Sequence, residues 1–203
     1  PYFTEEVRKI LIKNEKIGSK LYTNGYSVRT TLDPSIQIKA EEALIEGLEN
    51  LDKRQGWRGP ISNYNLLDST NEELSKYLQD LQTQLPKKRH AGIVIKVSKN
   101  IIDVMLHKEE KIKVEFKNTS WLRPQTLKKD DKNRLIIHLG SKYKNFEQFI
   151  SNGDIVIVKE NQNKNVTNYS LSQIPNVNGA IVAIDPNTGR VLAMSGGYNF
   201  QKS

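Results

Sequence analysis

A series of short apolar runs in the middle of the chain limits its possible folds more than any other feature. The runs are rich in Ile, Val and Leu and are bounded by polar turns, which predicts β-strands. They lie at residues 91–97, 101–107, 112–116, 135–139, 153–159 and 169–174. A longer connection, residues 117–145, contains only one of them, and Trp121 and Leu122 are its expected packing anchors. Five or more short strands in this order predict a small closed β-barrel of the OB type, since closure leaves no exposed strand edge.

Amphipathic segments on the N-terminal side of these strands predict helices. Asp33 and Pro34 indicate a helix start, because an Asp side chain accepts hydrogen bonds from free backbone N–H groups and Pro has no N–H group to leave unpaired. The helix that follows has one apolar face, formed by Ile36, Ala40, Ala43, Leu44, Leu48 and Leu51. Such a face must pack against another element. Further helices are expected at residues 4–17 and 71–85, and a strand at residues 26–32.

The last part of the chain predicts a β-hairpin. Residues 180–184 and 191–194 are almost entirely apolar, and they flank a turn in which Pro186 fixes φ and Gly189 accepts a positive φ. Strands of this kind are expected to be buried on both faces. The residues that follow are too few to cover them, so we expect the hairpin to open a domain that continues beyond Ser203. The fold class predicted for the whole chain is α+β, mainly β.

Composition excludes several classes of function. The formal net charge is +8, but the 23 Lys and 8 Arg residues are scattered among acidic residues, which is typical of a solvated surface. The chain has no cysteine, and His90, His107 and His138 lack the close spacing of metal ligands. No cofactor-binding or metal-binding residue is therefore expected. No stretch approaches the roughly 18 consecutive apolar residues of a membrane-spanning helix.

Motifs at the two ends of the chain carry a resemblance to a known family. The first set is Val28-Arg29-Thr30-Thr31-Leu32-Asp33, Ile36-Gln37 and Ala40-Glu41-Glu42-Ala43. It resembles the linker that follows the glycosyltransferase domain of bifunctional class A penicillin-binding proteins. The second set is Gly179-Ala180-Ile181-Val182-Ala183-Ile184-Asp185-Pro186, Thr188-Gly189, Val191-Leu192-Ala193-Met194 and Gly196-Gly197-Tyr198. It resembles the first hairpin of their transpeptidase domain, and Gly56-Trp57-Arg58-Gly59-Pro60 is similar to the 1A type of Gram-negative bacteria.

The resemblance implies an arrangement of domains. Residues 1–60 would be the linker between the glycosyltransferase and transpeptidase domains. Residues 61–177 would be an inserted OB-like domain with its barrel at about 90–175, and residues 178–203 the first hairpin of a transpeptidase domain. In this family the whole protein is anchored in the inner membrane, faces the periplasm and builds peptidoglycan. Its catalytic glutamate and acylated serine would lie before Pro1 and after Ser203, so no catalytic residue is expected here.

Formal matches to the transpeptidase motifs occur but carry little weight. Ser141-Lys142-Tyr143-Lys144 matches Ser-x-x-Lys, of which a chain with this many Ser and Lys residues contains about 1.6 by chance. Two segments match Ser-x-Asn, namely Ser69-Thr70-Asn71 and Ser98-Lys99-Asn100. Both precede the Ser141 match in the sequence, which reverses the order of the motifs in the family. We therefore expect no acylation of Ser141 by β-lactams.

Two functions of different classes follow from these expectations. The first is a non-catalytic docking or regulatory region of a peptidoglycan synthase. Its partners would be other domains of the same synthase, an outer-membrane lipoprotein activator or peptidoglycan, with membrane attachment only through an N-terminal anchor outside this chain. The alternative is an OB module for single-stranded nucleic acid, which normally stacks bases on aromatic side chains. Phe116 is the only aromatic residue in the runs from 91 to 116, so nucleic acid is not the expected partner.

Overall fold

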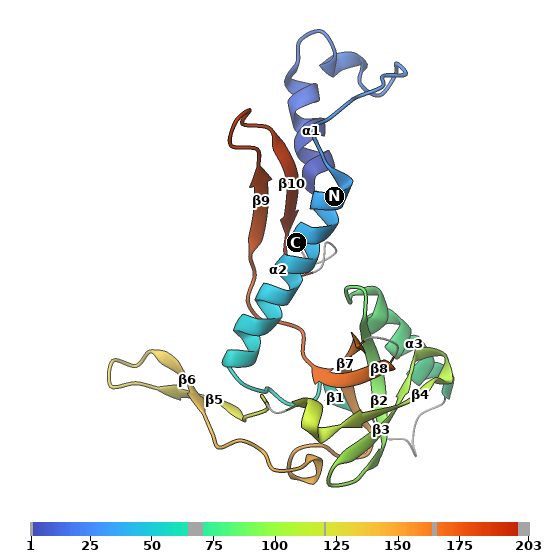
Figure 1. Cartoon of the computed structure of the whole chain (residues 1–203), viewed down its shortest axis with the longest axis vertical. Helices are drawn as coiled ribbons and strands as arrows, with labels where there is room; N and C mark the ends of the chain where they lie inside the picture. Colours follow the sequence, from blue (N-terminus) through green and yellow to red (C-terminus); the bar gives the residue numbers. More distant parts are fainter. Residues whose placement is uncertain (1, 65–70, 120, 164–165, 199–203) are drawn as a thin grey trace. The chain divides into compact units, whose positions relative to one another are not determined.

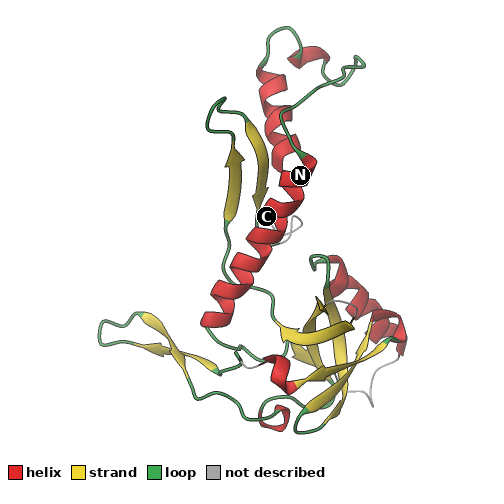
Figure 2. Cartoon of the chain, viewed as in Figure 1, coloured by secondary structure: helices red, strands yellow, loops and turns green. Residues whose placement is uncertain are grey.

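The chain forms two compact units in the computed structural model. The structure describes residues 2–64, 71–119, 121–163 and 166–198 (Figure 1). One unit comprises residues 49–176 and the other residues 1–48 together with 177–203. Most of the strands belong to the first unit (Figure 2).

A closed five-stranded barrel forms the body of residues 49–176. Its strands are β2 (Arg89–Val97), β3 (Ile101–Leu106), β4 (Lys111–Glu115), β7 (Asp154–Asn163) and β8 (Val166–Ser172). They follow the order β7-β2-β3-β4-β8, and pairing between β7 and β8 closes the sheet. The β4–β8 pair is parallel and the others are antiparallel. A sixth strand, β1 (Ser62–Asn63), pairs with β7 outside the ring. The predicted barrel of the OB type is confirmed.

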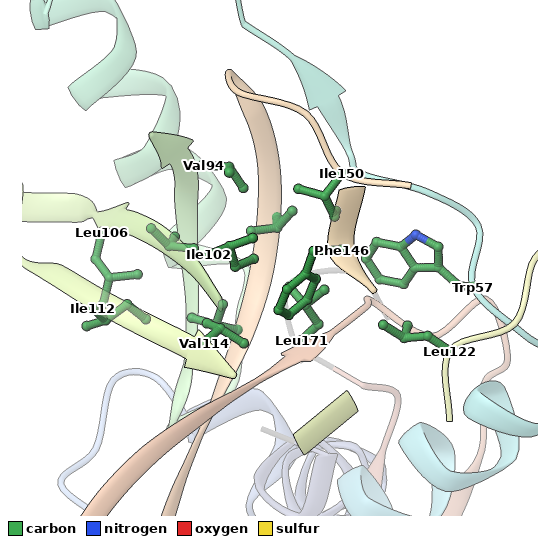
Figure 3. Close-up of a cluster of buried hydrophobic side chains, with 13 residues drawn as sticks. Trp57, Val94, Ile102, Leu106, Ile112, Val114, Leu122, Phe146, Ile150 and Leu171 are labelled. Carbon is green, nitrogen blue, oxygen red and sulfur yellow. The ribbon is translucent and has the colours of Figure 1, made fainter. Parts of the chain in front are cut away.

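Alternating residues of these strands fill the barrel (Figure 3). Val94, Ile102 and Leu171 are fully buried there, because side chains on a strand point to opposite faces in turn. Phe146, on the short 3₁₀-helix η4 (Phe146–Gln148), has no exposed surface and closes the interior. The remaining buried members of this core are Trp57, Val104, Leu106, Ile112, Val114, Leu122, Ile150, Val156 and Val158. The packing role predicted for Leu122 is confirmed, and Trp121 packs edge-on against Trp57 with ring centroids 6.0 Å apart.

Helix α3 (Asn71–Thr83) covers the outer face of β2 and β7. Leu74 and Leu78 of the helix are buried against Ile93 and Ile155, whose side chains point away from the barrel interior. The helix predicted at 71–85 is confirmed, although it ends at Thr83.

A second hairpin, β5 (Gln125–Lys129) and β6 (Leu135–Leu139), forms a separate two-stranded sheet. β6 was predicted, but β5 was not, because its sequence Gln-Thr-Leu-Lys-Lys is polar and contains a single large apolar residue. Short 3₁₀-helices η2 (His107–Glu109) and η3 (Phe116–Thr119) complete this unit.

The other unit combines α1 (Tyr2–Lys13), η1 (Gly18–Lys20), α2 (Pro34–Arg54) through Leu48, β9 (Ala180–Ile184) and β10 (Val191–Gly196). The predicted start of α2 is confirmed: Asp33 Oδ1 accepts hydrogen bonds from the backbone N–H groups of Ser35 (2.8 Å) and Ile36 (3.1 Å). The side-chain hydroxyl of Ser35 also donates to Asp33 Oδ1 (2.7 Å), and this bond, together with the two backbone bonds, holds the pKa of Asp33 below its usual value.

Two predictions for this unit are wrong in detail. The helix expected at 4–17 spans Tyr2–Lys13. No strand forms at 26–32 in the described structure; Thr31 Oγ1 instead donates to the carbonyl of Val191 (2.5 Å), and Asp33 N donates to that of Leu192 (2.9 Å). On the 180–194 hairpin, Val182 and Ile184 are 47% and 56% exposed, which agrees with the expectation that the residues of this chain do not cover both faces. β9 pairs only with β10 in the described residues, so its outward side chains face solvent.

Candidate functional site

The last two turns of α2 bury carboxylates where the sequence predicted an apolar face. Glu49 is 2% exposed and Asp52 is fully buried, whereas Leu51 is 39% exposed. Residues three apart lie on the same side of a helix, so the two carboxylates share one face. Burying two charges requires cationic and hydrogen-bonding partners, which the barrel supplies.

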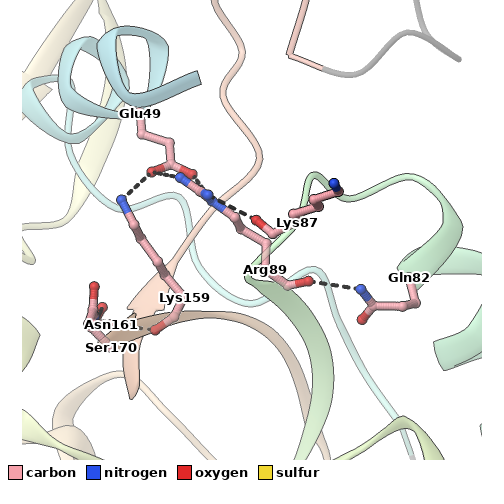
Figure 4. Close-up of polar contacts among 7 residues, drawn as sticks. All are labelled: Glu49, Gln82, Lys87, Arg89, Lys159, Asn161 and Ser170. Atoms are coloured by element: carbon pink, nitrogen blue, oxygen red, sulfur yellow. Dashed lines mark hydrogen bonds and ion pairs between the residues drawn. The ribbon is translucent and has the colours of Figure 1, made fainter. Parts of the chain in front are cut away.

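Glu49 binds two cations from neighbouring barrel strands (Figure 4). Its two carboxylate oxygens accept from Nε (2.7 Å) and Nη2 (2.9 Å) of Arg89, and Oε2 also accepts from Nζ of Lys159 (3.0 Å). Arg89 and Lys159 are directly opposite each other in the β2–β7 register. Burial raises the pKa of Glu49, but the hydrogen bonds and charges of Arg89 and Lys159 outweigh it and hold the pKa below its usual value.

Asp52 forms a second buried cluster with residues that precede the first barrel strand, β2, and residues that follow the last one, β8. Arg58 donates to both of its carboxylate oxygens, at 2.8 and 3.0 Å. Gln173 Nε2 (2.7 Å) and the backbone N–H of Asn176 (3.1 Å) donate to the same carboxylate. Arg58 Nη2 also donates to the carbonyl of Ile174 (2.7 Å). The cluster therefore joins the beginning and the end of residues 49–176.

The backbone next to this cluster anchors the β5–β6 hairpin. Trp57 N donates to the carbonyl of Arg123 (2.7 Å), and Gln125 N donates to the carbonyl of Trp57 (2.9 Å). Gly56 has φ +94°, and a Cβ atom there would lie 2.6 Å from Cδ2 of Leu139. The left-handed backbone favours glycine at this position, and a Cβ atom would in addition displace the Leu139 side chain and lie 3.0 Å from the carbonyl oxygen of Arg123.

Hollows on this unit include one of about 370 Å³ at the β2–β3 turn, lined by Lys96, Lys99 and Asn100 among others, and two more. The one beside the Asp52 cluster has a volume of about 150 Å³ and is lined by Arg58, Ser172 and Gln173 among others, well below the ~300 Å³ of a small-molecule pocket. A wider hollow of about 490 Å³ lies between α3 and the segment from β3 to η2, and its lining includes Leu74, Met105 and Glu109. The polar clusters thus join elements of the fold and do not line a ligand-sized pocket.

The formal motif matches lie apart from these clusters. Ser141 is exposed in the loop between β6 and η4, and it makes no hydrogen bond with another described residue. Ser98-Lys99-Asn100 forms the turn between β2 and β3, while Ser69 and Thr70 lie outside the described residues. His90 Nε2 lies 3.5 Å from Glu160 Oε2, and His107 and His138 belong to other elements. No cluster of three potential metal ligands occurs in the described ranges, and none of the described helices is long and apolar enough to cross a membrane.

The buried Glu49 and Asp52 clusters were missed at the level of sequence. Their partners lie from 6 to 124 positions away along the chain, so spacing could not pair them. The available signal was local: two acidic residues three positions apart, Glu49 directly after Leu48 and Asp52 directly after Leu51, beside a predicted apolar face.

Comparison with known proteins gives consistent matches. Residues 57–177 match the family described as penicillin-binding protein OB-like domain. Over its whole length the chain is 33% identical to penicillin-binding protein 1A of Rickettsia felis, and over 98% of its length 29% identical to that of Vibrio cholerae. It spans 22% and 23% of these relatives, about a fifth of their length. The crystal structure of penicillin-binding protein 1A from Haemophilus influenzae shares the fold, with a TM-score of 0.70 at 24% identity over all of this chain and 26% of that one.

Proposed function

Since this chain belongs to the penicillin-binding proteins of the 1A type and carries their OB-like domain, we propose that residues 49–176 are a non-catalytic docking module of a peptidoglycan synthase. The parent protein would polymerise glycan strands and cross-link stem peptides through domains outside this chain. It would be attached to the inner membrane and face the periplasm. The module would bind another domain of the synthase, an outer-membrane lipoprotein activator or peptidoglycan.

The observation that carries this proposal is that the buried charged side chains bind other residues of the unit. Four charged side chains are buried among the described residues, namely Glu49, Asp52, Arg89 and Asp154. Glu49 and Arg89 bind each other, and Asp52 binds Arg58 and Gln173. Asp154 accepts hydrogen bonds from Asn63 Nδ2 and Ser151 N, both at 2.8 Å. Active sites instead use buried ionisable groups to act on a substrate in a cleft. Here their partners are other elements of the same unit, which supports a structural role.

The proposal excludes β-lactam acylation of this chain, and intact-mass spectrometry tests that directly. The 203-residue chain is incubated with benzylpenicillin beside a Ser141→Ala variant. We expect both masses to stay unchanged, because Ser141 makes no hydrogen bond to a described side chain that could take its proton. An adduct of one drug molecule that forms on the original chain and is absent from the variant would contradict a non-catalytic role.

A further inference from the structure

The β5–β6 hairpin is held firmly at one end and extends from the barrel as a two-stranded ribbon (Figure 1). At its root, Gly140 N donates to the carbonyl of Pro124 (3.0 Å) and Arg123 Nε to that of Gly140 (2.9 Å), beside the bonds to Trp57. Trp57 is itself 3% exposed in the barrel core. The ribbon is therefore fixed to the rigid part of the unit.

The tip of the hairpin is also ordered by its own hydrogen bonds. Asp130 Oδ1 accepts from the backbone N–H groups of Lys132 (3.0 Å) and Arg134 (2.8 Å), and Oδ2 accepts from Arg134 Nε (2.8 Å). Asn133 has φ +60°, a left-handed conformation that Asn tolerates better than most residues. A preformed loop loses little conformational entropy when it binds.

The register of the two strands gives the ribbon one apolar face. Leu127 lies opposite Ile137, Lys129 opposite Leu135 and Gln125 opposite Leu139, and residues directly opposite each other point to the same side. Leu127 and Leu135 are 64% and 65% exposed, and Ile137 is 41% exposed. An isolated two-stranded hairpin is at best marginally stable in water, and contiguous exposed aliphatic residues indicate a binding surface.

Cations lie on both faces of the ribbon and at its tip: Lys129 lies opposite Leu135 on the apolar face, and Lys128 lies opposite Ile136 on the other face. Arg134 is paired with Asp130, whereas Lys128, Lys129 and Lys132 have no ion-pair partner in the part of the chain that the structure describes. Asp131 is the only other acidic residue of the tip. A second copy of the hairpin would bring like charges together, so the charge distribution favours an acidic partner.

We propose that the β5–β6 hairpin is the docking element of this module, and that it binds a protein whose apolar groove is rimmed by Asp and Glu residues. The inference rests on the proposed function, since it names the surface and the partner of the docking module. Leu127, Leu135 and Ile137 supply the apolar contact. Lys129 on the same face and Lys132 at the tip supply orientation, and the open outer edges of β5 and β6 offer backbone groups for strand pairing.

Site-specific photocrosslinking of the intact protein, in the cells that make it, tests this inference. A photoreactive phenylalanine replaces Leu127 or Ile137 on the apolar face, Thr126 or His138 on the opposite face, and Ile101 on the barrel. We expect one partner protein, identified by mass spectrometry, to be attached at 127 and 137 with a yield at least roughly tenfold above that at 126 and 138.

Charge reversal gives the matched control. Replacing Lys129 and Lys132 by Glu should lower the adduct yield at 137 by roughly tenfold or more, because like charges then face the acidic rim. The same reversal at Lys96 and Lys99, two lysines at the β2–β3 turn, changes the net charge equally and should leave the yield unchanged. Unchanged tryptophan fluorescence would establish that both variants fold.

The remaining outcomes separate this inference from the proposed function. Adducts at Ile101 without adducts at 127 and 137 would overturn the hairpin assignment and leave a docking module with another surface. Absence of any adduct at all five positions, whether to another protein, to another domain of the synthase or to peptidoglycan, would overturn both. Attachment to a second copy of the chain, to lipid or to peptidoglycan would overturn the partner class proposed for the hairpin.

Discussion

Replacing Glu49 by Ala should strongly destabilise the barrel unit. The Glu49 side chain is 1% exposed and that of Arg89 only 11%, so the variant leaves a guanidinium buried without its carboxylate. Removing one partner of a buried ion pair typically costs about 3–5 kcal/mol. Lys159, whose side chain is 22% exposed, can turn its ammonium group toward water and so is not left buried without a partner. The expected cost therefore lies at the lower end of this range, about 3 kcal/mol.

Urea unfolding followed by tryptophan fluorescence measures this cost. Both tryptophans of the chain, Trp57 and Trp121, lie in residues 49–176, so the signal reports on that unit. With a urea dependence of about 2 kcal/mol per molar, the midpoint should fall by roughly 1.5 M. Glu115→Ala is the matched control: this carboxylate pairs with Lys117 at the surface, and its loss should cost less than about 1 kcal/mol.

The difference between the original chain and Glu49→Gln should also depend on pH. The folded-state pKa of Glu49 is lower than the ordinary value of 4.5. A depressed carboxylate pKa contributes stability that is fully present above the unfolded-state pKa and is lost as the pH falls through the folded-state pKa. The difference should therefore be constant from pH 7 to about 5 and shrink in more acidic solution. A Glu49→Ala cost no larger than that of Glu115→Ala, or a pH-independent difference, would refute a stabilising ion pair.

Three further predictions concern the barrel. Gly56→Ala should destabilise the unit by more than Gly59→Ala in the same urea assay. Both glycines have positive φ, but only at Gly56 would an added Cβ atom collide with Leu139. Equal costs for the two variants would contradict this close approach. Phe146→Ala should cost about 3–5 kcal/mol by opening a cavity at a fully buried ring, and a cost below about 1 kcal/mol would place the ring outside the core. In filter binding at low salt, single-stranded DNA should show no tight, saturable retention by the chain; salt-dependent saturation would favour a nucleic-acid function.

The barrel was predictable from local pattern because its strands are rich in Ile and Val and its turns are polar. Val94, Ile102, Val104 and Val114 face the interior at the alternation that a strand requires. The strand β5 was missed because a pattern of buried apolar residues was the only signal for a strand. Its polar sequence has no buried face in the described structure, so that signal is absent. Residues 26–32 have β-favouring composition, but that preference was not sufficient to form a strand.

The polar clusters could not be predicted, because charge burial depends on which residues meet in three dimensions. Leu51 and Asp52 are adjacent in sequence, and the helix period alone assigns Leu51 to the interior. Arg58, Gln173 and the backbone of Asn176 converge on Asp52, and this determines which side of the helix is buried. The apolar face of the β5–β6 hairpin could not be predicted either. Which residues share that face depends on the register between the two strands, and β5 was not among the predicted strands.

Excision of the module from the intact synthase tests the docking role most directly. Asp52 Oδ1 and Asn176 N are 3.1 Å apart, so a short Gly-Ser linker can replace the residues between them. Glycan polymerisation and penicillin acylation are then measured with and without the partner attached by photocrosslinking. We predict that the excised synthase keeps both basal rates and loses the change in rate caused by the partner. Loss of the basal rates in a folded protein, or a full response to the partner, would contradict a non-catalytic docking module.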